Sequence, residues 1–178
     1  MSIYKNIILV LLVTPALSYA SPSNSKNVYR ALKQSDQNWK SSVAVENPHI
    51  DTLSGIGMNK RIDRQVRWRA IVAAMGLNQS TSRKKLIKNI VNSNDWFLKN
   101  ALLVGARELP RNNALAVAKL LLNDKSLLVR TEAVKLIGFH KGVELRKDLR
   151  LSLNNPINFK HGKPLWVHRH IKNVLAEM

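Results

Sequence analysis

Four stretches of the sequence share one pattern, in which an apolar residue leads a helix-like run with a small or apolar residue four places further on. The leading residues are Val66, Phe97, Val129 and Val167, so successive leads are 31, 32 and 38 residues apart. Self-similarity at a period of about 20 to 50 residues is the mark of a repeat protein, whose short units bury their apolar faces by stacking. The pattern therefore predicts a stack of similar units that share one continuous core.

From residue 61 onward, apolar residues recur with the spacing of amphipathic helices, and capping residues, glycines and prolines separate one helix from the next. No strand pattern competes with this periodicity. The chain is therefore predicted to be all-α, with about seven helices in this part. Their expected ranges are 61–75, 80–91, 94–108, 111–122, 126–139, a sixth that follows Gly142 and ends near 153, and a last one with Pro164 in its first turn.

One of the repeated units carries a family resemblance. Residues 123–138 read NDKSLLVRTEAVKLIG, in which an aspartate precedes Val129-Arg130, and an alanine and a Leu–Gly ending follow. This order of residues resembles the HEAT repeat, and residues 63–76 resemble it too. The resemblance covers about residues 60–178 and implies a right-handed α-solenoid of HEAT-like helix pairs.

The other two units depart from that pattern. The second unit keeps Asp95 and Ala101 but has Leu98-Lys99 where Val-Arg is expected, and the fourth has His168 at the arginine position. In HEAT-like repeats the aspartate and the arginine bridge neighbouring units. The resemblance therefore implies structural roles for Asp63, Arg67, Asp124 and Arg130.

The first twenty residues have the layout of a secretory signal peptide. Lys5 provides a positive charge, residues 7–13 form a short apolar core, and small residues stand at the end, up to Ala20. The apolar stretch is well short of the roughly 20 residues that a helix needs to cross a bilayer, so a retained membrane anchor is the weaker alternative. We therefore predict cleavage after Ala20 and a mature protein that is periplasmic or secreted.

Residues 21–59 differ in composition from the part that follows. They are rich in Ser and Asn, with scattered Pro and Gly, and only residues 27–34 suggest a short helix. Because the rest has no sustained period, we predict a flexible, mostly extended N-terminal arm ahead of a repeat domain at 60–178.

The charge of the chain is strongly positive. Removal of residues 1–20 takes away one of the 29 basic residues and none of the 11 acidic ones, which leaves a net charge of +17. Such a charge raises association rates with anionic partners, although a merely solvated surface is the alternative. The chain has no cysteine, so no disulfide stabilises the fold and no thiol is available as a nucleophile.

No catalytic arrangement of residues stands out. The sequence has no Gly-rich phosphate loop, and its acidic residues are spread singly except for Glu144 and Asp148. His168 and His170 are two apart on a predicted helix, so they point to different sides and cannot share a metal ion. We therefore expect a protein that is not an enzyme and that uses no cofactor or metal.

Basic residues gather on the first two helices of the predicted repeat domain. Arginine and lysine interleaved with tryptophan is the composition of a surface that contacts phosphates and stacks on planar groups. We expect Trp96 and Trp166 in the core, and leave Trp68 open between core and surface. The predicted partner-binding residues are Lys60, Arg61, Arg64, Arg67, Trp68, Arg69, Arg83, Lys84 and Lys85. The five bases Lys60, Arg61, Arg64, Arg67 and Arg69 are expected where a partner can reach them.

These observations favour a scaffold that binds a macromolecule through a basic face. HEAT-like repeats imply scaffolding or protein binding, so the expected partner is another exported or envelope protein. The alternative is an anionic polymer, such as lipopolysaccharide, another cell-wall polyanion or nucleic acid. A minority of HEAT-like proteins act on nucleic acid or tetrapyrroles, and the signal peptide argues against contact with genomic DNA.

Overall fold

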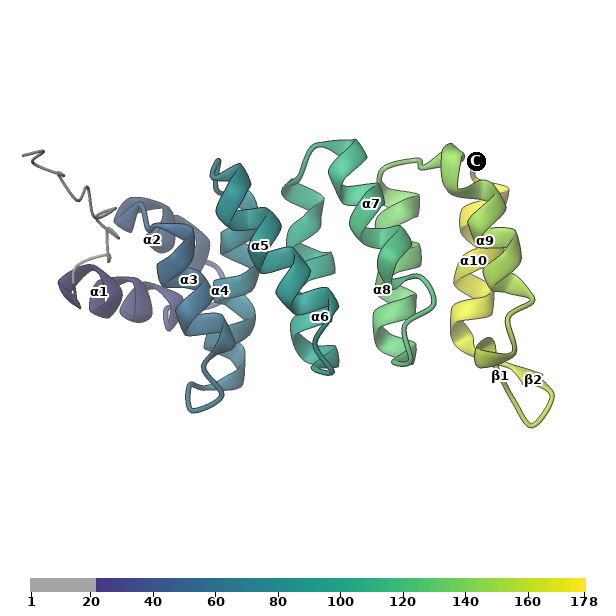
Figure 1. The fold of residues 1–178 in the computed structure, drawn as a ribbon, viewed down its shortest axis with the longest axis horizontal. Helices are drawn as coiled ribbons and strands as arrows, with labels where there is room; N and C mark the ends of the chain where they lie inside the picture. The colour runs from purple at the N-terminus through teal and green to yellow at the C-terminus, as the bar shows by residue number, and fades with distance from the viewer. Residues whose placement is uncertain (1–21) are drawn as a thin grey trace, which may run out of the picture.

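The computed structural model of the protein describes residues 22–178 and is mostly helical (Figure 1). The predicted signal peptide, residues 1–20, lies outside the described residues. The helices are α1 (Pro22–Leu32), α2 (Trp39–Glu46), α3 (Ile50–Met58), α4 (Arg64–Gly76), α5 (Ser80–Val91), α6 (Trp96–Gly105), α7 (Arg111–Leu121), α8 (Leu127–Phe139), α9 (Arg146–Leu153) and α10 (Trp166–Ala176). The prediction of an all-α fold is confirmed, and seven of these helices, α4 to α10, lie in the part for which about seven were predicted.

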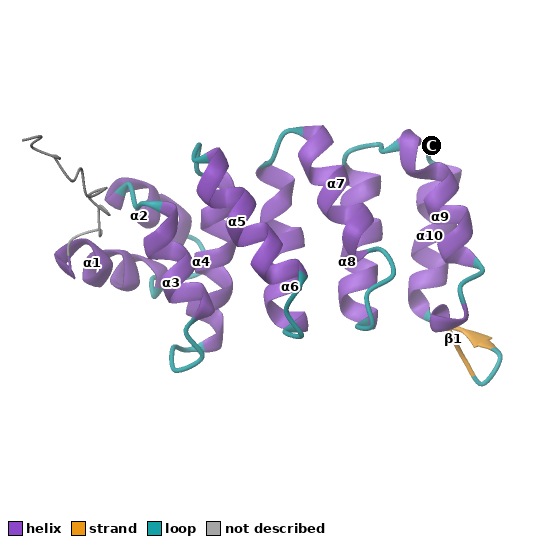
Figure 2. Cartoon of the chain, in the orientation of Figure 1, coloured by secondary structure: helices purple, strands orange, loops and turns teal. Residues whose placement is uncertain are grey.

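Short irregular elements join the helices. Three 3-10 turns occur at Ala106–Glu108, Val143–Leu145 and Pro156–Asn158, and a small antiparallel hairpin pairs β1 (Phe159–Lys160) with β2 (Lys163–Pro164) (Figure 2). The expectation that Pro164 begins the last helix is wrong, because this residue belongs to the hairpin and α10 starts at Trp166. The hairpin turn uses two residues with positive φ, His161 and Gly162, which is the geometry of a tight two-residue turn.

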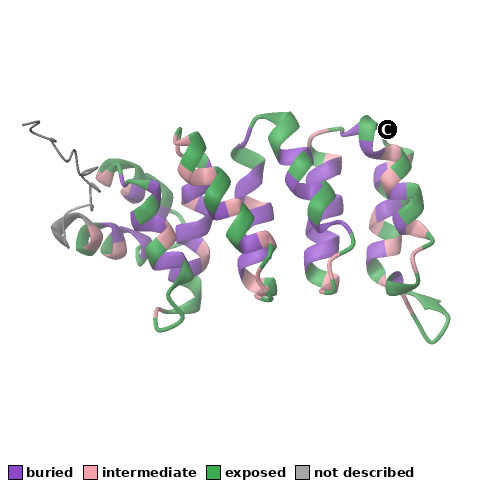
Figure 3. Cartoon of the chain, in the orientation of Figure 1, coloured by how far each residue is buried: buried purple, intermediate pink, exposed green. Residues whose placement is uncertain are grey.

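The helices from α3 onward form two rows. Helix α4 packs on α6, α6 on α8 and α8 on α10, while α3 lies beside α5 and α5 beside α7 in the other row, which α9 continues (Figure 1). Apolar side chains between the rows form a continuous buried core, and the exposed residues lie on the outer sides (Figure 3). The core depends on both rows, because each helix is amphipathic and buries its apolar stripe only against its neighbours.

A series of buried bases joins each helix of the first row to the next unit. The Arg67 guanidinium donates to the backbone oxygen of Gly57 (2.9 Å) and to Asp95 (3.2 Å), and the Lys99 ammonium donates to Asp124 (2.6 Å). Arg130 continues the series by donating to the side-chain oxygen of Asn158 (2.7 Å). We call the contacts of Arg67 with Asp95, Lys99 with Asp124 and Arg130 with Asn158 the base ladder.

The contacts of the base ladder test the structural roles that the family resemblance implies for four residues. The structural roles of Arg67, Asp124 and Arg130 are confirmed, since each contacts a neighbouring unit. Asp63 also has a structural role, but it serves its own helix by accepting from the backbone N–H groups of residues 65 and 66 at the start of α4. Lys99, which departs from the Val-Arg pattern, occupies the same place in the series as the two arginines.

The prediction of an extended arm at residues 21–59 is wrong for residues 22–58. Three helices occupy this segment, and Leu53 and Ile56 of α3 are buried against the rest of the core. Gly57 explains part of the error, because a Cβ at this position would lie 2.4 Å from the Ile71 side chain of α4. The glycine suggests a loop in the sequence, whereas in the fold it allows two helices to approach closely.

An arginine at the start of α7 fixes the loop that follows α8. Arg111 forms a bidentate pair with Glu144 (2.6 and 2.7 Å) and donates to the backbone oxygens of His140 and Lys141. The hydrogen bond from Arg111 holds the pKa of Glu144 below its ordinary value. The pKa of His140 is also lowered, because burial and the positive charge of Arg111 both disfavour its protonated form.

Candidate functional site

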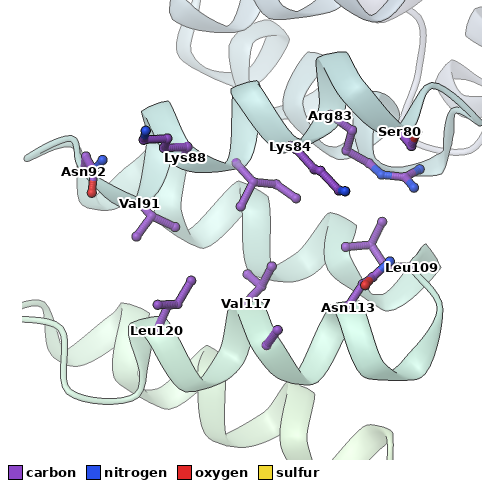
Figure 4. A pocket seen from close by; sticks show the side chains of 12 residues that line it. Ser80, Arg83, Lys84, Lys88, Val91, Asn92, Leu109, Asn113, Val117 and Leu120 are labelled. Atoms are coloured by element: carbon purple, nitrogen blue, oxygen red, sulfur yellow. The ribbon is translucent and has the colours of Figure 1, made fainter.

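A groove of about 460 Å³ runs between α5 and α7. Figure 4 shows its two walls, with residues from Ser80 to Asn92 on one side and residues from Leu109 to Leu120 on the other. Apolar residues form the floor: Ile87, Val91, Leu109, Ala116, Val117 and Leu120. The polar residues at its edges are Ser80, Arg83, Lys84, Lys88, Asn92 and Asn113.

The floor has an exposed apolar contact at one end. Val91 of α5 and Leu120 of α7 point toward one another across the groove (Figure 4). The Leu120 side chain is 65% exposed, because Val117 and Leu121 on the same helix already fill the inward positions. A leucine exposed to this extent gains from any apolar partner that covers it.

The edge of the groove formed by α5 is positively charged. Lys84, Lys85 and Lys88 are exposed, and among the described residues none of them has a carboxylate within ion-pair distance. The chain has no acidic residue between Asp63 and Asp95, so nothing in α4 or α5 offsets these charges. Lys84 extends toward the space between the helices (Figure 4).

The predicted partner-binding residues divide into exposed, half-buried and buried ones, and five of them are exposed. Lys84 and Lys85 are exposed on α5, and Lys84 lines the groove. Lys60 and Arg61 are exposed in the loop before α4 and do not line the groove. Arg64 is also exposed, and its guanidinium lies 4.9 Å from the ring centre of Trp96 and 4.4 Å from that of Phe97, which is cation–π distance.

The expectation that Arg67 and Arg69 are accessible is wrong. Both are buried, Arg67 in the base ladder and Arg69 against the end of α1. Arg69 donates to the backbone oxygens of Leu32 (2.8 Å) and Gln34 (2.6 Å), and it pairs with Asp36. A buried arginine with these partners holds the N-terminal helices onto α4 and is not accessible to a ligand.

Arg83 is intermediate between the exposed and the buried bases. It lines the groove near Ser80 and is half-buried. Its Nη1 atom donates to the backbone oxygen of Leu77 (2.6 Å) at the end of α4. Arg83 therefore serves mainly to satisfy a helix terminus, so the free charge at the groove comes from Lys84 and Lys88.

Trp96 and Trp166 lie closer to the surface than expected. Trp96 is 39% and Trp166 is 48% exposed, so the prediction that both are core residues is wrong. Each lies one or two positions before a buried residue of its own helix, and this offset turns the tryptophan toward the outer side of the helix. Trp68 is half-buried and its indole N–H donates to Asn100 (3.2 Å), so it joins α4 to α6.

The groove floor is the part of the site that sequence reasoning missed. Lys88 is not among the predicted partner-binding residues, and the helical spacing of Ile87 and Val91 does not distinguish a groove from the core. A usable signal was present in the fourth predicted helix. Its apolar residues, including Leu120, span more than one face of the helix. Because only one face can be buried, this pattern predicts that an apolar side chain is exposed to solvent.

Within residues 22–178, no group of three or more His, Cys, Asp or Glu residues is placed to hold a metal ion. No helix in this part of the chain is both long and apolar enough to cross a membrane. Searches against protein families, curated proteins and solved structures found no match to this chain. The function is therefore inferred from the groove and its charge.

Proposed function

We propose that the protein is an exported, non-enzymatic scaffold that binds a protein partner through the basic face of α5. We further propose that its two rows of helices are a right-handed α-solenoid of HEAT-like helix pairs, as the sequence pattern of residues 123–138 suggests. The proposal rests on one observation: Lys84, Lys85 and Lys88 are exposed, have no carboxylate partner in the described part of the chain, and lie on the helix that forms one wall of an open apolar groove.

The combination of apolar floor and charged edge favours a protein over a polyanion. Protein interfaces join an apolar centre to a polar, charged rim, and the groove offers both within one site. An anionic polymer needs only the charge. The polymer remains the second candidate, because α4 and α5 together carry seven basic residues and no acidic one.

Export is proposed from the order of residues 1–20, and it is tested directly. Protein isolated from the exported fraction of its own cells is expected to begin at Ser21, since signal peptidase cuts after small residues such as Ala20. N-terminal sequencing is the measurement. A protein that begins at Met1 in that fraction would contradict the cleavage.

Partner binding is tested by charge reversal on α5. The mature chain with Lys84, Lys85 and Lys88 changed to Glu is expected to fold normally and to lose the proteins that the unaltered chain captures from an envelope extract. The control reverses Lys147, Arg150 and Lys172, which are also exposed and have no ion pair among the described residues. Both variants change the net charge by the same amount, so a difference in capture between them is due to the position of the changed residues on α5.

Two outcomes of this experiment distinguish a protein partner from a polyanion. Capture of the same proteins by the α5 variant at the same salt concentration would withdraw the proposal. Equal losses in both variants, together with an affinity that falls steeply with salt, would instead identify a polyanion binder. A third variant with Lys60, Arg61 and Arg64 reversed shows whether the loop before α4 and the first residue of α4 add to the same surface.

A further inference from the structure

We infer that the groove between α5 and α7 accepts an acidic amphipathic helix of the partner, with its apolar face on the floor and its carboxylates beside Lys84 and Lys88. This inference rests on the proposed function and adds the form and chemistry of the segment that binds. It is argued from the shape, the floor and the charge of the groove.

The shape of the groove suits a helix. Its walls are two neighbouring helices of 12 and 11 residues, which at a rise of about 1.5 Å per residue are about 17 Å long, or three helical turns. A third helix can place its side chains between those of two others by ridges-into-grooves packing. A partner segment of about 12 residues therefore matches the length of the site.

The groove does not provide the features that bind the two other common forms of peptide segment, a β-strand and a polyproline helix. An added strand requires a free sheet edge, whereas the backbone groups of α5 and α7 are used within the two helices. A polyproline segment is recognised by aromatic side chains, and the residues that line the groove include none. The apolar floor and helical walls thus favour a helix that presents aliphatic residues.

The charge of the groove selects an acidic partner. No carboxylate lines the groove, and the nearest acidic residue in the sequence, Glu108, pairs with Lys40 (3.5 Å). Acidic residues on the flanks of a helix that lies on the floor would face Lys84 and Lys88. A basic helix would meet like charges at the same positions.

A second copy of this chain does not fit the requirement. The net charge of the mature chain is +17, and its helices carry few acidic residues, for example only Glu132 in α8 and only Asp148 in α9. Glu132 is already paired with Arg107 (2.7 Å). The occupant is therefore a segment of a different protein.

The test uses three labelled peptides and fluorescence anisotropy with the mature chain. The first is a helix-forming 16-residue peptide with leucines on one face and glutamates on its flanks. The second contains the same residues in scrambled order, and the third has lysine in place of every glutamate. The first peptide is expected to bind saturably and the other two at least about tenfold more weakly.

Matched variants show whether the peptide lies in the groove. Leu120→Asp is expected to weaken binding of the first peptide by about tenfold or more, because it removes the exposed apolar contact. Leu151→Asp on α9 is the control, since Leu151 is also 65% exposed and lies outside the groove. Lys84→Glu with Lys88→Glu is expected to cause a similar loss, and Lys147→Glu with Arg150→Glu little change.

The outcomes separate this inference from the proposed function. Equal binding of the first two peptides, no saturable binding at all, or no effect of Leu120→Asp would overturn the helical occupant. If the α5 charge reversal still abolishes capture from the envelope extract, the basic face remains a binding site for another kind of segment. If that reversal has no effect on capture, the proposed function fails as well.

Discussion

A chain that begins at Lys60 is expected to lose most of its stability relative to one that begins at Ser21. The deletion removes α1 to α3 and uncovers the side of α4 on which α3 packs. Several of the lost residues are fully buried, among them Leu32, Ile50 and Leu53, and each contributes about 1.5–3 kcal/mol. The sum is comparable to the whole free energy of unfolding of a domain, about 5–15 kcal/mol.

The same deletion also removes partners from two buried arginines, although Arg67 keeps its contact with Asp95. Arg67 loses the backbone oxygen of Gly57, and Arg69 loses Leu32, Gln34 and Asp36 together. Thermal and urea unfolding followed by circular dichroism are the measurements. A shortened chain with an unchanged unfolding midpoint would show that α1 to α3 do not belong to the core.

A point variant checks the same contact without shortening the chain. Leu53→Ala in α3 is expected to lower the free energy of unfolding by about 2–5 kcal/mol, as is usual for a fully buried leucine. An effect close to zero would mean that α3 does not pack on α4 in solution.

The second large effect is expected from Asp124→Ala in the base ladder. The Lys99 and Asp124 side chains are 9% and 7% exposed and lie 2.6 Å apart. Removal of the carboxylate leaves a buried ammonium without its partner, which costs about 3–5 kcal/mol in free energy of unfolding. The variant also removes the hydrogen bond from the backbone N–H of Ser126 (2.8 Å) at the start of α8.

A second lysine–carboxylate pair provides the control. Lys119 and Asp148 also join two neighbouring helices, but the lysine side chain is 58% exposed. Asp148→Ala is therefore expected to change stability by at most about 1 kcal/mol. In the double variant Lys99→Met with Asp124→Ala, the loss should be smaller than the sum of the two single losses. Additive losses would show that the ladder contact makes no contribution of its own.

The helices from α4 onward could be predicted because local and tertiary signals agree there. Asp63 and Asp95 cap α4 and α6, and the apolar positions repeat with a helical period through α8. In residues 22–58 these signals disagree. Gly57 and the scattered Ser and Asn residues disfavour a helix locally, and only burial against α4 stabilises one.

The positive charge of the candidate site could be predicted from the sequence, but the apolar floor of the groove could not. The absence of acidic residues between Asp63 and Asp95 is visible in the sequence and places the positive charge on α4 and α5. Which arginines stay exposed depends on partners more than 25 residues away, such as Asp95 for Arg67 and Leu32 for Arg69. The groove likewise needs two helices from different units to lie side by side.

The base ladder also gives the protein a direction. Each rung has its base in one unit and its acceptor in the unit that follows. Lys99 therefore stays unpaired until Asp124 is in place, and Arg130, which already donates to the backbone oxygens of Asp124 and Lys125, lacks its contact with Asn158 until that residue is in place. An acceptor left without its base still caps its own helix, as Asp95 does for α6. As the chain emerges from its N-terminus, each unit is therefore completed by the next one to appear, and folding is expected to advance in the order of synthesis.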